Sequence, residues 1–376
     1  MPTSNKIDCY WATHGADIKT TGQVKPCCIF KEEYSPDIHV KNGLSKYRSS
    51  DWYKNFIKYF QEGKKHPGCE MCWNHEKHNL PSRRLEHNKL VADQIDQTNN
   101  KDLQMLTFSY GTTCNLACRI CGPHSSSKWA SIQKQHDNDT WPTYNWLKDD
   151  KIFFDIIENS ENVKYFEFPG GEPLLADTEK HLEILKHLIY LDKAKNTTLN
   201  YTTNMTMFPK KDYWNIWKEF KQVLIVGSCD DIEERFEYNR YPAIWDNVYE
   251  NIKKYKEKNK TQQNFNFKLN FTVSIFTILR INEISKFFVK NGFVPYINYL
   301  DHPKVFSVNL IQPYLKEIIK STKHPYLVKT ITNFYDKDWS NLIPEFKKTI
   351  YKYDKQRNQD FEKTFPELIK YIDGKK

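Results

Sequence analysis

TFSYGTTCNLACRICG, residues 107–122, contains three cysteines in the spacing C-x3-C-x2-C. They are Cys114, Cys118 and Cys121, and they follow an apolar run typical of a β-strand. Three thiolates at this spacing can hold three irons of a 4Fe-4S cube, and the segment lacks a fourth cysteine that would complete the coordination. One iron is then open to another ligand. Structural zinc is the alternative, although it prefers four protein ligands, commonly from two C-x2-C pairs.

Glycine-rich and polar motifs follow the next three strand-like runs. They are Gly170-Gly171-Glu172-Pro173 after residues 163–168, Asn204 after residues 198–203, and Ser228 and Asp230 after residues 222–226. In barrel-type parallel sheets the reactive residues gather where the strands end, so we expect these motifs to lie beside the three cysteines. Taken alone, a Gly-Gly-Glu-Pro sequence is also typical of an ordinary turn.

This ordered set of motifs resembles the signature of the radical S-adenosylmethionine (SAM) superfamily. The resemblance implies that Cys114, Cys118 and Cys121 hold a 4Fe-4S cluster, and that the amino and carboxylate groups of SAM bind its open iron. Reduction by an external electron donor then cleaves SAM to methionine and a 5′-deoxyadenosyl radical, which abstracts hydrogen from a substrate. In such enzymes the cofactor carries the chemistry, and the protein positions it and excludes side reactions.

The resemblance also implies which residues bind SAM. Gly170, Gly171, Glu172 and Pro173 are expected near the methionine amino group of SAM, and Ser228 and Asp230 at its ribose or carboxylate. Asn204 and Arg240 are expected close to the bound SAM. The two glycines allow a close approach of the backbone, and a carboxylate suits a neighbouring cation. Ile120 stands where the family commonly has an aromatic residue, so one adenine contact is expected to be aliphatic. Cys229 is predicted to be a buried thiol.

A second group of cysteines lies in the first hundred residues: Cys9, Cys27, Cys28, Cys69 and Cys72. Adjacent residues on a strand point to opposite faces, so Cys27 and Cys28 cannot easily face the same metal. We expect Cys27, directly after a proline, to join Cys9, Cys69 and Cys72 as the four ligands. The spacing leaves both structural zinc and an iron-sulfur cluster open.

Several features around these cysteines resemble the SPASM or twitch module of radical SAM proteins. They are Cys9, the Gly-x-Val-x-Pro-Cys turn at residues 22–27, Cys69-x-x-Cys72-Trp73, Glu76 and Ser82-Arg83-Arg84. The resemblance implies an auxiliary iron-sulfur cluster, in a module that here precedes the barrel. Asn79 replaces the glycine expected after Glu76, and asparagine also tolerates positive φ.

From residue 103 onward, strand-like and helix-like runs alternate. The strand-like runs are residues 103–109, 163–168, 198–203, 222–226, 265–276 and 293–300. Such alternation predicts an α/β fold with parallel strands and right-handed crossovers, which an open doubly wound sheet would also satisfy. The family resemblance implies a partial (β/α)6 TIM-type barrel at residues 101–300. We expect a twitch-like domain with a helical connector at residues 1–100, and a helical C-terminal extension at residues 301–376.

Composition adds broad limits. The chain has 376 residues and a net charge of +9, from 56 basic and 47 acidic side chains, which is mild for a dedicated nucleic-acid-binding protein. It has no run of about 18 apolar residues and no apolar signal-peptide core near Met1, so we expect a cytoplasmic protein without a membrane segment. Nine cysteines in such a compartment indicate metal ligands rather than disulfides.

The combined hypothesis is a radical SAM enzyme with two iron-sulfur clusters. Relatives with SPASM or twitch modules often act on peptides or proteins, so a peptide or protein substrate is expected. The first alternative is radical SAM modification of a nucleotide, sugar or RNA. The second belongs to another class, a non-catalytic iron-sulfur or zinc binding protein.

Overall fold

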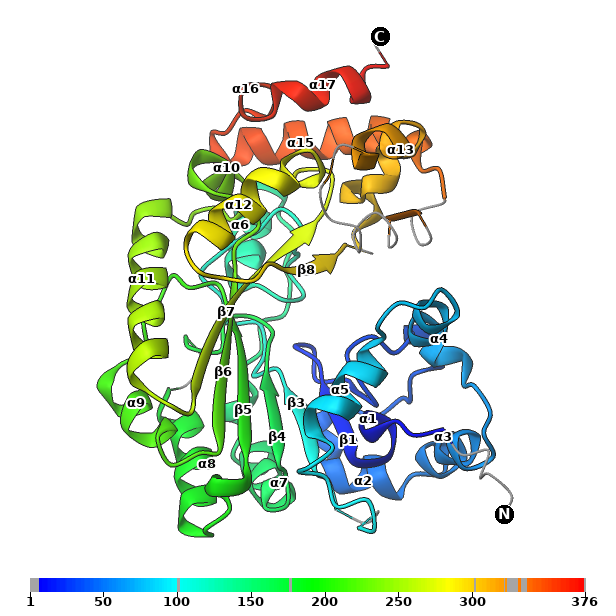
Figure 1. Cartoon of the computed structure of the whole chain (residues 1–376), viewed down its shortest axis with the longest axis vertical. Coiled ribbons are helices and arrows are strands. Elements are labelled where there is room, and N and C mark those ends of the chain that lie inside the picture. The colour runs from blue at the N-terminus through cyan, green and yellow to red at the C-terminus, as the bar shows by residue number, and fades with distance from the viewer. Residues whose placement is uncertain are drawn as a thin grey trace.

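The structure is a computed structural model of the chain (Figure 1). It describes residues 7–99, 102–175, 178–300, 302–320, 322, 331–332 and 337–374. The expected domain boundaries at residues 100, 101 and 301 lie outside these ranges.

One eight-stranded sheet forms the centre of the described chain, in the order β2-β1-β3-β4-β5-β6-β7-β8. Neighbouring strands run parallel except β1 and β2, which are antiparallel. The strands are β1 (Gly15–Ile18), β2 (Val24–Lys25), β3 (Met105–Phe108), β4 (Tyr165–Phe168), β5 (Thr198–Thr203), β6 (Gln222–Ser228), β7 (Phe265–Val273) and β8 (Tyr296–Tyr299).

The α-helices fall into three groups along the chain. The N-terminal group is α1 (Tyr10–His14), α2 (Leu44–Ser49), α3 (Asp51–Gln61), α4 (Glu70–Lys77) and α5 (Arg83–Val91). The helices between strands are α6 (Ser127–Asp137), α7 (Asp150–Ser160), α8 (Thr178–Tyr190), α9 (Lys211–Trp217), α10 (Glu233–Asn239), α11 (Trp245–Thr261) and α12 (Ile281–Lys290). The C-terminal group is α13 (Gln312–Lys320), α15 (Ile343–Arg357), α16 (Phe361–Thr364) and α17 (Pro366–Ile372). Among the described helices, none combines the length and apolar character needed to cross a membrane.

The two faces of the sheet differ in packing and exposure. On one face, aromatic side chains pack against the crossover helices, with ring centroids 5.2 Å apart for Tyr201 and Trp217 and 4.9 Å apart for Tyr255 and Phe267. Side chains alternate along a strand, so Val226 and Lys268, paired neighbours in β6 and β7, lie on the opposite face. Lys268 is exposed there. The sheet therefore has one sealed apolar face and one face that is open between β5 and β7.

The six strand-like runs expected after residue 103 are confirmed as β3 to β8, and the mostly parallel sheet is consistent with a partial barrel. The sheet has two strands more than the six expected at residues 101–300. β1 pairs in parallel with β3, from Gly15 opposite Met105 to Ile18 opposite Phe108, so the N-terminal segment adds two strands. Figure 1 shows this segment, in blue, beside β3. The division into domains stays a prediction.

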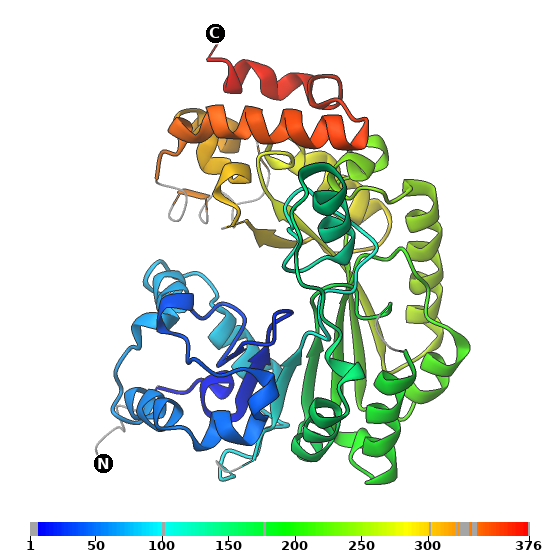
Figure 2. The ribbon, with the colours of Figure 1, turned by 180° about the vertical axis from the view of Figure 1, so that it is seen from behind.

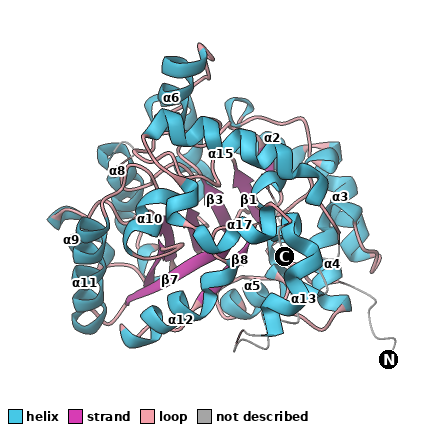
Figure 3. Cartoon of the chain, turned by 90° about the horizontal axis from the view of Figure 1, so that it is seen from above, coloured by secondary structure: helices cyan, strands magenta, loops and turns pink. Residues whose placement is uncertain are grey.

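The C-terminal helices lie across the end of the molecule toward which the parallel strands run (Figures 1 and 2). Seen from above, α15 passes near α6 (Figure 3). Tyr353 of α15 packs on Trp129 of α6, with ring centroids 4.6 Å apart. The C-terminal extension therefore covers the segment that follows the three clustered cysteines.

Candidate functional site

The segment with the three cysteines follows β3 without regular secondary structure and is held by backbone contacts. Ala117 and Arg119 donate their backbone N–H groups to the carbonyls of Tyr241 and Asn239, at 2.6 and 2.8 Å. The Trp129 indole donates to the Cys118 carbonyl at 2.9 Å. These contacts fix the segment between α6 and the end of α10.

The three thiols lie close enough to affect one another's titration. Burial, with a smaller effect from Cys118, raises the pKa values of Cys114 and Cys121 to about 12. Burial also raises the pKa of Cys118. Because metals bind the thiolate, iron binding here must release protons from all three groups.

The Gly170-Gly171 turn requires glycine at both positions. Both residues have positive φ, 70° and 56°. A Cβ on Gly170 would lie 2.5 Å from the Ser109 hydroxyl oxygen, and one on Gly171 would lie 2.5 Å from the Thr113 carbonyl oxygen. Glu172 donates its backbone N–H to the same Thr113 carbonyl at 2.7 Å. The turn therefore lies directly against the residue that precedes Cys114.

The buried carboxylate of Glu172 connects this turn to β5. It accepts hydrogen bonds from the Thr203 hydroxyl at 2.8 Å and from the backbone N–H groups of Asn204 and Leu174, at 2.6 and 3.2 Å. Burial raises the pKa of Glu172 to about 7, although these donors favour the ionised form. Pro173 beside it is also buried. Glu172 thus has a structural role besides the expected contact with SAM.

The remaining predicted residues converge on the same cysteines. The Asn204 amide nitrogen lies 3.9 Å from the sulfur of Cys114, and a guanidinium nitrogen of Arg240 lies 4.0 Å from that of Cys118. Arg240 is buried and pairs with Asp230 at 2.7 Å. The other Asp230 oxygen accepts from the Thr272 backbone N–H at 2.9 Å.

The structure thus brings the predicted residues of this site to one end of the parallel sheet. Ser228 ends β6, and Asp230 follows it. Cys229 is confirmed as a buried thiol, and it donates to the Asp231 carbonyl at 3.3 Å.

Sequence reasoning assigned no role to three charged residues at this site. Arg119, which is fully buried, donates to the Asp354 carboxylate of α15 at 2.5 Å. The same carboxylate accepts from the Tyr238 hydroxyl at 2.8 Å and from the Phe361 backbone N–H at 2.7 Å. Arg357, one turn further along α15, lies over the Trp129 ring at 4.3 Å. The signal in the sequence was the Asp-x-x-Arg spacing, which places both side chains on one helix face.

The N-terminal cysteines form a second group around one pocket. Its lining includes Cys9, Cys27, Cys69 and Cys72. Burial raises the pKa of each of the four thiols, and neighbouring cysteines raise it further for Cys9, Cys27 and Cys69. Cys28 is not among the lining residues, and its carbonyl instead accepts from the Lys19 ammonium at 3.0 Å. The two adjacent cysteines therefore differ in their surroundings, although they lie in a turn after β2 and not on a strand, so strand alternation is not the reason.

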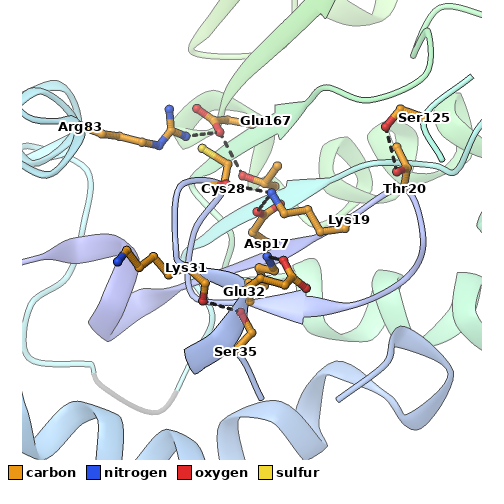
Figure 4. A network of polar contacts seen from close by, with 12 residues as sticks. Asp17, Lys19, Thr20, Cys28, Lys31, Glu32, Ser35, Arg83, Ser125 and Glu167 are labelled. Atoms are coloured by element: carbon orange, nitrogen blue, oxygen red, sulfur yellow. Dashed lines mark hydrogen bonds and ion pairs between the residues drawn. The ribbon is translucent and has the colours of Figure 1, made fainter. Parts of the chain in front are cut away.

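A network of buried charges lies beside this pocket (Figure 4). Arg83 of α5 lines the pocket and pairs with Glu167 of β4 at 2.6 Å. Burial alone would raise the pKa of Glu167, but the charge of Arg83 and the hydrogen bonds from Thr107 and Arg83 hold this pKa low. Nearby, the Lys19 ammonium contacts both the Cys28 carbonyl, at 3.0 Å, and Asp17 of β1, at 2.9 Å. The pair of Arg83 and Glu167 therefore joins the N-terminal segment to β4 of the barrel.

A second ion pair supports α4 and α5 around the pocket. Arg84 holds Glu76 through two hydrogen bonds, at 2.7 and 3.0 Å, and the Ser82 hydroxyl donates to the same carboxylate at 2.6 Å. Asn79 between them has φ 54°, as expected for a residue in place of glycine.

A single metal ion needs several ligands that converge on one point. Among the described residues, no group of three or more His, Cys, Asp or Glu side chains is arranged to hold a metal ion. A 4Fe-4S cluster distributes its irons, with one thiolate to each, so its ligands need not converge on one point. Four thiols around one pocket and three thiols with nearby cations fit such clusters.

Part of the chain that includes this site matches the model of a known protein family. Residues 108–277 match the model of the Radical SAM superfamily. The matched region runs from the last residue of β3 to just beyond β7 and includes Cys114, Cys118 and Cys121. No curated protein sequence matches the chain.

Solved structures similar to this chain include two of anSMEcpe and one of SuiB. Native anSMEcpe with bound AdoMet is 19% identical over 62% of this chain and 63% of its own length, with a TM-score of 0.41. Native anSMEcpe with bound AdoMet and Kp18Cys peptide is 17% identical over 58% of this chain and 59% of its own, with a TM-score of 0.42. Streptococcus suis SuiB is 15% identical over 84% of this chain and 68% of its own, with a TM-score of 0.39.

Proposed function

We propose that the chain reductively cleaves SAM at a 4Fe-4S cluster held by Cys114, Cys118 and Cys121, and uses the product to abstract hydrogen from a substrate. One observation carries this proposal: three thiols without a fourth local cysteine lie beside Asn204 and Arg240 at the carboxyl end of a parallel sheet. When bound, the cluster supplies the electron, taken from an external donor, that splits the sulfonium of SAM.

The chain's own residues would bind and orient SAM. The Gly170-Gly171 turn exposes backbone for the methionine amino group, and Glu172 in its ionised form provides a nearby negative charge. Ser228, with Asp230 paired to Arg240, would orient the ribose or carboxylate. Burial of Glu172, Asp230 and Arg240 excludes water from the reacting atoms.

A peptide or protein is the proposed substrate. The support is the resemblance of the N-terminal segment to SPASM and twitch modules, together with its four-cysteine pocket, which we propose holds an auxiliary iron-sulfur cluster. The open face of the sheet beside Ser228 carries the exposed side chains of Thr202 and Lys268, and Lys268 offers a cation for a peptide carboxylate.

The test uses the full chain, purified without oxygen and reduced with dithionite in the presence of SAM. We expect 5′-deoxyadenosine from the wild-type protein and none from Cys114→Ala, Cys118→Ala or Cys121→Ala. Cys229→Ser is the matched control, since that thiol is buried and lies outside the triplet. Release of 5′-deoxyadenosine by a variant lacking all three cysteines would refute the proposal. Zinc without iron in the N-terminal pocket would refute the auxiliary cluster alone.

A further inference from the structure

Arg357 is a buried cation whose guanidinium lacks a hydrogen-bond acceptor. The residue is 5% exposed, and within the described chain none of its three side-chain nitrogens has a partner. Buried arginines are nearly always paired, because leaving such a charge uncompensated costs several kcal/mol. The side chain therefore lies in an environment that suits a missing anion.

Aromatic rings surround Arg357 but do not replace that anion. The guanidinium carbon lies 4.3, 5.0 and 5.4 Å from the ring centroids of Trp129, Tyr353 and Tyr241. Each such contact contributes about 0.5–2 kcal/mol and leaves every N–H group without an acceptor. Burial, followed by the nearby charge of Arg119, lowers the pKa of Arg357 to about 9, so the group stays charged at neutral pH.

The other two arginines near the cysteine triplet already have carboxylate partners, which leaves Arg357 as the cation that an anion there would pair with. Arg119 is paired with Asp354, and Arg240 is paired with Asp230. These two carboxylates are thus engaged, and Arg357 remains as an uncompensated positive charge. Arg357 lies beside Cys118, because the Trp129 ring that it covers at 4.3 Å donates its indole N–H to the Cys118 carbonyl at 2.9 Å. The Gly170-Gly171 turn and Asn204 instead approach Cys114.

A 4Fe-4S cluster held by three thiolates has the required chemistry. Its sulfur atoms accept hydrogen bonds, and its thiolates give the site a negative charge that grows when the core takes up an electron. A fixed cation beside the cluster favours the reduced state of that cluster. Hydrogen bonds and charges around the sulfurs are the main means by which proteins set such potentials.

We propose that Arg357 is a positioning residue that donates hydrogen bonds to sulfur of the SAM-cleaving cluster beside Cys118 and raises its reduction potential. The inference rests on the proposed function, because it needs the cluster at the cysteine triplet. The step affected is the uptake of one electron from an external reductant, with no bond made or broken in the protein. The C-terminal extension thereby acts on the cluster through α15.

The test is a redox titration of the anaerobically reconstituted full chain, followed by electron paramagnetic resonance. The relevant cluster is the one whose reduced signal changes when SAM is added. For Arg357→Met we expect about a tenfold lower ratio of reduced to oxidised cluster at a fixed potential, which is about 59 mV for a one-electron couple. Arg357→Lys, which keeps the charge, should lie much closer to wild type. Lys355→Met removes a charge from the exposed side of the same helix and should change nothing.

Unfolding measurements separate this role from simple packing. In metal-free protein, Arg357→Met removes an uncompensated buried charge and should cost little stability, whereas the cluster-loaded protein should lose more. An equal loss in both forms, or an unchanged potential in Arg357→Met, would overturn the inference. If that variant does not fold, Arg357→Gln replaces it in the titration. A wild-type protein with no SAM-responsive cluster would instead refute the proposed function.

Discussion

The backbone N–H of Asn204 donates to the carboxylate of Glu172 across 2.6 Å, which joins the end of β5 to the loop after β4. Asn204 in turn places its amide 3.9 Å from the sulfur of Cys114. One buried acid therefore helps to set the position of a residue that contacts the cysteine triplet. Changes at Glu172 are expected to alter both SAM binding and the shape of the site.

The titration of Glu172 should appear in the stability of the metal-free protein. Its pKa of about 7 in the folded state lies above the ordinary value of 4.5, so the folded state binds the proton more tightly. The resulting stabilisation is fully present below about pH 4.5 and is lost as the pH rises through about 7. Relative to Glu172→Gln, the wild-type free energy of unfolding should fall by about 3 kcal/mol over this window.

Urea unfolding at a series of pH values checks this prediction. The exposed Glu345 gives the control Glu345→Gln, for which no such difference is expected. A constant difference between wild type and Glu172→Gln from pH 4.5 to 7.5 would contradict it.

The adjacent cysteines of the N-terminal segment should differ in their effect on metal content. Cys27 lines the pocket with Cys9, Cys69 and Cys72, whereas Cys28 does not. Cys27→Ser should therefore remove most of the iron and sulfide of the auxiliary cluster, and Cys28→Ser should leave both near wild type. Iron and sulfide analysis of anaerobic protein measures this, and equal losses would show that the assignment of Cys27 is mistaken.

Breaking the ion pair of Arg83 and Glu167 should destabilise the chain strongly. Both side chains are largely buried, so Glu167→Gln leaves a guanidinium without its carboxylate, at a cost of about 3–5 kcal/mol. Arg83→Met with Glu167→Gln removes both charges and should cost less than the sum of the single changes. Chemical denaturation of the four proteins gives the coupling energy, and strict additivity would argue against a direct pair.

The contact between Arg119 and Asp354 should hold the cysteine segment in place. Asp354→Ala leaves the fully buried Arg119 without its carboxylate. It also removes the hydrogen bonds that Asp354 accepts from the Tyr238 hydroxyl and the Phe361 backbone N–H. We expect several kcal/mol of destabilisation and loss of the cluster at the triplet, while iron in the N-terminal pocket is retained. Lys355→Ala on the exposed side of α15 is the control, and full iron content in Asp354→Ala would contradict the prediction.

The barrel strands were predictable because their signals are local. Runs of apolar and β-branched residues separate helix-like segments, and the motifs with Glu172 and Asn204 end such runs. β1 gave no comparable signal, since it has only four residues and pairs with β3 about 90 positions away. Register between distant strands depends on packing, which local sequence patterns do not encode.

The charged groups around the cysteines were harder to predict for a related reason. Arg119 and Asp354 are separated by 235 positions, so neither side chain identifies the other in the sequence. Helical spacing places Asp354 and Arg357 on one face, but it does not say what that face covers. Buried ion pairs between distant segments become visible only with the fold.

The pairing of β1 with β3 has a consequence for the expression of residues 101–376 without the N-terminal segment. Removal of residues 1–100 would expose the backbone N–H and C=O groups of β3 along its free edge. An uncovered edge strand is a template for pairing with other chains. The shortened chain is therefore expected to self-associate or aggregate, and a soluble fragment would have to include β1 or a substitute for it.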